Sequence, residues 1–179
     1  MSQPFNFGAR FLESKGQPIS HAGRTIQMID RFPATYGEEI EVTIESTASR
    51  NVQGVAFSEG VEVFGERKKR AVVFEHFSVP PDERDQVRSR LPFSFVVTCR
   101  NRKGFVSFYN MALDGERQSW WHAGSAMIVE ETGGGRRYRC NDFEFDADFD
   151  DLIFTVRKKK AAEPGATDNP DDAQRVRKD

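Results

Sequence analysis

The most regular pattern along this chain is the alternation of apolar and charged residues that is typical of a β-strand with one buried face. Residues 39–45 alternate strictly, with Ile40, Val42 and Ile44 on one face and glutamate or threonine on the other. Shorter apolar or alternating runs follow, separated by turn-forming residues. We therefore predict further strands at residues 52–57, 61–64, 71–79, 92–100, 105–111, 125–131, 136–140 and 152–156.

Turn signals between these runs predict the connections. Residues 101–104 end in glycine and are typical of a hairpin turn, as are Asp114-Gly115 and the three glycines at 133–135. Only residues 81–90 have a helical composition, and they are too short and polar for a core helix. Roughly nine or ten short strands with such turns favour a single antiparallel β-sandwich, immunoglobulin-like or jelly-roll-like.

The last part of the chain differs from the rest. Residues 158–179 contain many charges, two prolines and one apolar residue larger than alanine, Val176. Such a segment cannot bury enough apolar surface to offset the entropy lost on ordering. We therefore predict a sandwich domain over residues 1–157 and a disordered charged tail over residues 158–179.

Composition narrows the class of function. The 179 residues include 16 phenylalanines, and the formal net charge of −2 argues against a strongly basic nucleic-acid binder. No run approaches about 18 consecutive apolar residues, so no membrane span is predicted. The N-terminus lacks the basic and apolar regions of a secretory signal, which favours a cytoplasmic protein and leaves non-classical export open.

Cysteine and histidine give little indication of catalysis. Cys99 and Cys140 are too few for a disulfide framework. Both fall in predicted strands, and whether they meet stays open, but in a reducing cytoplasm they would remain thiols. His21, His76 and His122 are scattered, and no known catalytic motif surrounds them. A non-enzymatic protein is therefore expected, with an accessory enzyme that uses His76 or His122 as the remaining alternative.

The densest chemistry lies in residues 141–151, where six acids fall within eleven residues and no base is present. The acids from 142 to 150 repeat at every second position, so an extended chain would place five carboxylates on one face. Like charges at that spacing repel unless water or a cation lies among them, and hard oxygen ligands suit Ca²⁺. The candidate ligands are Asp146, Asp148, Asp150 and Asp151, with Asn141, Asp142 and Glu144 as further contributors.

These acids do not form an EF-hand, because Asp151 and Arg157 stand where that loop requires glycine and glutamate. Residues 146–154 read DADFDDLIF, which resembles the D-x-D-[FY]-[ND]-D-[LIV]-[IV]-F motif that closes some bacterial β-sandwich modules associated with calcium. The resemblance implies that the aspartates of the motif supply ligands and that residues 152–154 begin the last core strand. The alternative is a solvated acidic segment that protects an edge strand from pairing with another sheet.

Three basic segments suggest a second kind of surface: residues 66–70, 100–103 and 136–139. The first two would lie as loops at one end of an up-and-down meander, where Arg67, Lys68 and Arg102 could bind an anion. If residues 120–131 form a hairpin bent at Gly124, the acidic segment lies at that same end. If they form one strand, it lies at the opposite end.

Both tryptophans are adjacent, at Trp120 and Trp121. Neighbouring residues of a strand face opposite ways, so we expect at most one of them in the core and an exposed Trp121 as a stacking surface. The leading hypothesis is a non-enzymatic calcium-binding module for a ligand, glycan or cell-surface partner. The alternative is a cytoplasmic protein-interaction or anion-binding module without metal, which uses the basic turns and the exposed tryptophan. The ligand, the strand order and the oligomeric state stay open.

Overall fold

The computed structural model describes residues 5–75 and 90–159, and it confirms the all-β sandwich. The one short helix within these described residues is α1 (Phe7–Glu13). No helix in the described part of the chain is long and apolar enough to cross a membrane. The strands are β1 (Ile19–His21), β2 (Arg24–Ile26), β3 (Asp30–Pro33), β4 (Glu39–Ser46), β5 (Val52–Val63), β6 (Glu66–Phe74), β7 (Phe93–Cys99), β8 (Phe105–Asp114), β9 (Arg117–Ser119), β10 (Ala126–Thr132), β11 (Gly135–Asn141) and β12 (Leu152–Lys158).

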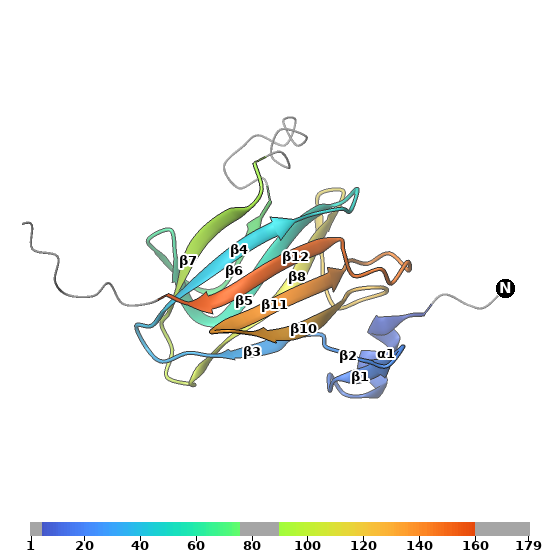
Figure 1. The fold of residues 1–179 in the computed structure, drawn as a ribbon, viewed down its shortest axis with the longest axis horizontal. Coiled ribbons are helices and arrows are strands. Elements are labelled where there is room, and N and C mark those ends of the chain that lie inside the picture. The colour runs from blue at the N-terminus through green and yellow to red at the C-terminus, as the bar shows by residue number, and fades with distance from the viewer. Residues whose placement is uncertain (1–4, 76–89, 160–179) are drawn as a thin grey trace, which may run out of the picture.

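Ten strands form one continuous antiparallel sheet that folds over on itself (Figure 1). Its order is β10-β11-β12-β4-β7-β5-β8-β3, with β6 added to β5 and β9 added to β8. Strand β5 joins the two layers, because one edge pairs with β6 while the other pairs first with β8 and then with β7. The change of partner occurs at a bulge at Glu59 and Gly60, both of which have positive φ.

The predicted strands at 52–57 and 61–64 are therefore a single strand, β5. The prediction failed because the bulge looks like a turn in the sequence. Residues 66–70 are not a loop either, since they form the first half of β6. Residues 101–104 do turn the chain, with Gly104 at φ 86°. However, β7 and β8 do not pair in the described sheet, so this turn crosses between layers and the predicted hairpin is wrong.

The main core fills the space between the layers with aliphatic and aromatic side chains from almost every strand. Tyr138 stacks on Phe154, with ring centroids 4.3 Å apart. Its hydroxyl donates to Asp30 of β3 over 2.7 Å, and Arg136 donates to the same carboxylate over 2.9 Å. These contacts tie β11 to β3 and satisfy a carboxylate that is almost fully buried.

The N-terminal helix α1 was not predicted from the sequence. Asn6 caps it by accepting from the amide of Ala9 over 2.9 Å, and Phe7 and Phe11 project from one face. Together with the β1–β2 hairpin, this helix forms a second apolar cluster beside β10. The segment predicted as helical, residues 81–90, lies almost wholly outside the described residues.

The end of the domain lies slightly beyond the predicted boundary. Strand β12 continues to Lys158, which forms an ion pair with Glu38, and the amide of Lys159 donates to the carbonyl of Glu39. The predicted disordered tail from residue 160 onward lies outside the described residues. The expectation that residues 152–154 begin the last core strand is confirmed, because β12 begins at Leu152 and pairs with strands on both sides.

Candidate metal centre

The acidic segment links β11 to β12 and is folded rather than extended. Ala147 and Phe149 adopt φ angles of 54° and 60°, which interrupt the alternation of an extended strand. The prediction of five carboxylates on one face is therefore wrong. Phe149 is buried in the second apolar cluster, 5.6 Å from the ring of Phe7, whereas Phe145 is 45% exposed. The buried ring of Phe149 therefore anchors the segment, and three of its six acids, Asp146, Asp148 and Asp150, are exposed.

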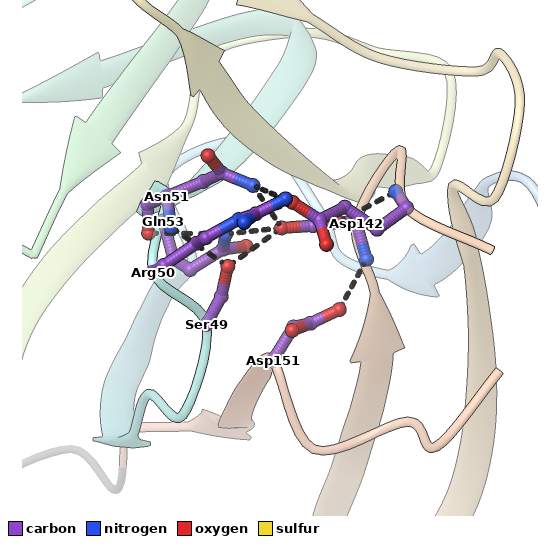
Figure 2. A network of polar contacts seen from close by, with 7 residues as sticks. Ser49, Arg50, Asn51, Gln53, Asp142 and Asp151 are labelled. Atoms are coloured by element: carbon purple, nitrogen blue, oxygen red, sulfur yellow. Dashed lines mark hydrogen bonds and ion pairs between the residues drawn. The ribbon is translucent and has the colours of Figure 1, made fainter. Parts of the chain in front are cut away.

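Asp142 is fully buried and lies at the centre of a network of polar contacts (Figure 2). Its Oδ2 accepts hydrogen bonds from Ser49 over 2.7 Å, Asn51 over 3.0 Å and Gln53 over 3.1 Å. Its Oδ1 accepts from the backbone amide of Glu144 over 2.8 Å. Four donors therefore surround this carboxylate, so the protein itself satisfies it and ties the β4–β5 loop to the acidic segment.

Asn141 is also held by the protein. Its side-chain amide donates to the carbonyls of Gly124 over 3.1 Å, Glu144 over 3.0 Å and Asp142 over 3.4 Å. Gly124 packs so closely here that a Cβ would lie 1.5 Å from the carbonyl oxygen of Glu144. Asn141 thus joins the loop of residues 120–125 to the acidic segment, and its contacts are structural.

Three aspartates converge on one point. A carboxylate oxygen from each of Asp146, Asp148 and Asp151 lies within 4.8 Å of the others. Asp146 and Asp148 are exposed, whereas Asp151 is 5% exposed. Asp151 directs one oxygen toward the backbone amide of Asp142, from which it accepts a hydrogen bond of 2.8 Å. The cluster therefore has a buried floor and an open side.

The electrostatics of this cluster favour a bound positive charge. Burial, followed by the carboxylates of Asp142, Asp146 and Asp148, raises the pKa of Asp151 to about 7. Burial and a neighbouring carboxylate also raise the pKa values of Asp146 and Asp148. A proton or a cation would relieve the repulsion, and the all-oxygen donor set fits a hard cation such as Ca²⁺.

The other acids of the segment lie outside the cluster. Asp150 is exposed, and its backbone amide donates to Oδ1 of Asp148 over 3.3 Å. Glu144 forms an ion pair with Arg50 over 2.8 Å. The alternative role, protection of an edge strand, does not apply to β12 because this strand has a partner on each side.

Sequence reasoning missed the residues that hold the acidic segment in place: Ser49, Asn51 and Gln53. A buried second carboxylate, Glu75, extends this group by accepting from the amide of Gln53 over 3.2 Å and from the hydroxyl of Thr47. Ser49 and Asn51 are ordinary loop residues and Gln53 lies inside β5, so their spacing gave no signal. Only the fold, which brings Ser49 to Asp142 from 93 residues away, reveals the contact.

Two of the three basic segments converge, although not as two loops at one end, and the third, residues 136–139, lies in β11 away from them. Arg67 and Lys68 of β6 line a groove together with Arg100 and Lys103, whereas Arg102 is not among its lining residues. The groove lies beside the end of β12 that carries Lys158, and the acidic segment lies at the opposite end. Residues 120–125 form a loop between β9 and β10, so neither predicted arrangement of residues 120–131 is correct.

The tryptophans and the remaining reactive groups also differ from expectation. Both Trp120 and Trp121 are half-buried against the main core, because they lie in a loop where strand alternation does not apply. Trp121 has φ 57° and packs 5.0 Å from the ring of Tyr109, so it is not the exposed stacking surface that we expected. His122 lies 3.2 Å from the hydroxyl of Ser119. His76 is outside the described residues.

Cys99 and Cys140 are buried free thiols, in β7 and β11. Burial raises the pKa of Cys140 well above its ordinary value, which keeps this thiol protonated and unreactive.

Comparisons of the chain with protein-family models, curated proteins and solved structures found no match.

Proposed function

We propose that this protein is a non-enzymatic calcium-binding β-sandwich module, with Asp146, Asp148 and Asp151 as its metal ligands. The observation that carries the proposal is the convergence of these three carboxylates within 4.8 Å. Asp142, Asn141 and Asp150 take supporting parts: the first two hold the segment through protein contacts, and Asp150 adds negative charge at the surface.

Calcium fits this donor set better than the other common metals. Its flexible shell of six to eight oxygens can combine three carboxylates with backbone carbonyls and water. Zinc and copper sites in proteins are built mainly from nitrogen or sulfur ligands, and the three side chains of the cluster offer only oxygen. Magnesium demands near-octahedral geometry and dehydrates reluctantly, so we expect it to bind this open site more weakly.

Calcium would stabilise the acidic segment, because it would relieve the repulsion between the three carboxylates of the cluster. The backbone between the ligands carries Phe149, which packs against helix α1 and β10. A cation at the aspartates would therefore stabilise the loop and the N-terminal helix together. We propose that this ordered end of the sandwich binds a glycan or a protein partner in a calcium-dependent manner.

Thermal unfolding in excess Ca²⁺, in excess Mg²⁺ and in chelator tests the proposal. Binding to the folded state alone raises its stability by about 2.7 kcal/mol at a ligand concentration one hundred times the Kd. The shift should disappear in Asp148→Asn and persist in Glu130→Gln, which removes an equal charge from an exposed residue of β10. Three coincident melts of the wild-type protein would overturn the proposal, as would equal loss in both variants.

A further inference from the structure

We infer that the basic groove beside the β5 bulge binds a small organic polyanion, a sugar that carries several phosphate or sulfate groups. The inference is independent of the calcium site, because the groove lies at the opposite end of the sandwich. Its volume of about 420 Å³ falls in the range of small-molecule sites.

The fold builds this groove from two distant segments. At the bulge, the amide of Arg100 donates to the carbonyl of Gly60 over 3.0 Å, which holds the β7–β8 turn against β5. On the other edge of β5, strand β6 presents Arg67, Lys68 and Lys69. Lys103 completes the lining from the β7–β8 turn. The positive charges are thus brought together by backbone geometry rather than by one run of sequence.

The charges in the groove do not balance. Five cationic residues line it, against three carboxylates in or beside it: Glu59, which pairs with Lys103, Glu66, which pairs with Lys68, and Glu62. Glu62 lies beside the groove and accepts from Nε of both Arg67 and Arg100, over 3.3 Å and 2.9 Å, so two guanidinium groups share one carboxylate. Among the described residues, Lys69 takes part in no ion pair.

The same contacts leave most of the guanidinium donors available for an anion. A guanidinium carries five N–H donors, and the shared contact with Glu62 uses only Nε of each arginine. Arg100 also lies 5.9 Å from the ring of Tyr36, which restricts its side chain. Planar, partly fixed guanidinium groups beside lysine ammonium groups suit clustered phosphate or sulfate oxygens.

A sugar-sized ligand fits these observations better than a nucleic acid does. A polymer requires basic residues along an extended track and gains from a positive net charge. In this protein, by contrast, the five cationic groups line one depression of limited volume, and the formal net charge of the chain is −2.

Calorimetric titration of the full chain in metal-free buffer tests the inference. The probes are myo-inositol hexakisphosphate for phosphate esters, sucrose octasulfate for sulfate esters and a short DNA duplex as a polymer control. We expect saturable binding of at least one small probe, one per chain. Tighter binding of one small probe than of the other shows whether the groove prefers phosphate esters or sulfate esters.

Two charge reversals then locate the site. Lys69→Glu lies in the groove, and Arg24→Glu makes the same change on an exposed residue of β2, outside it. We expect Lys69→Glu to weaken binding roughly tenfold, whereas Arg24→Glu leaves it unchanged. Failure of both small probes to bind would overturn the inference. Equal loss in the two variants, or tighter binding of the duplex than of either small probe, would also overturn it.

Discussion

Replacement of Asp142 by alanine probes the network that holds the acidic segment in place. The change removes the acceptor of four hydrogen bonds in a fully buried position. Each donor left without a partner costs about 1–3 kcal/mol, but the loop can relax and admit water. By analogy with the rupture of buried ion pairs, we expect a total loss of about 4 kcal/mol in the free energy of unfolding.

Asp142→Asn is a milder change, because the asparagine side chain has almost the same shape as the aspartate side chain. The amide oxygen can still face the three side-chain donors, but its NH₂ group then meets the backbone N–H of Glu144. One hydrogen bond and the negative charge are lost, so we expect a loss of about 2 kcal/mol.

Urea unfolding in chelator, followed by tryptophan fluorescence, measures these changes. Asp150→Ala is the control, since its side chain is exposed, and it should change stability by less than about 0.5 kcal/mol. The slope of the transition should stay constant across the variants. A loss below about 1 kcal/mol in Asp142→Ala would refute the assignment of Asp142 as the anchor of the segment.

Three further predictions follow from the same contacts. The pKa of Asp151 is raised from 3.8 to about 7, so between these values the native apo protein holds a proton that the unfolded chain has lost. Its stability should therefore fall by about 4 kcal/mol at most as pH rises through this window. Melts in chelator should show the fall, and saturating Ca²⁺ or Asp151→Asn should flatten it. Gly124→Ala should destabilise the fold by about 3 kcal/mol or more in urea, because the added Cβ meets the carbonyl of Glu144. Phe149→Ala should remove about 3 kcal/mol and hasten proteolysis near α1, whereas unchanged cleavage there would contradict the packing of this ring against the helix.

The fold class was readable from the sequence because alternation reports burial directly. Residues 39–45 matched β4 closely, and the glycine-rich turn at 133–135 does join β10 to β11. Pairing partners were not readable, since a turn such as 101–104 has the same composition whether it joins neighbours or crosses between layers. The predicted strand at 71–79 begins five residues after the true start of β6 at Glu66. The first half of β6 is exposed and charged, so it shows no alternation of apolar and polar residues.

The candidate metal site was only partly accessible to sequence reasoning. The density of acids pointed to the segment that holds the cluster. The argument from period-2 spacing, however, requires an extended backbone, and the positive φ angles of Ala147 and Phe149 show that the backbone is not extended there. The spacing also could not show that Asp142 is satisfied by protein donors whereas Asp151 belongs to the candidate metal cluster. The distinction depends on Ser49, Asn51 and Gln53, which surround one carboxylate and leave the other beside its acidic neighbours.

Isothermal titration of the wild-type protein with Ca²⁺, with Asp148→Asn measured beside it, decides whether the three aspartates hold a cation. We expect saturable binding of one ion per chain, loss of that binding in Asp148→Asn, and release of protons near neutral pH as Asp151 ionises. The absence of a binding isotherm at millimolar Ca²⁺, or an unchanged isotherm in the variant, would contradict this expectation.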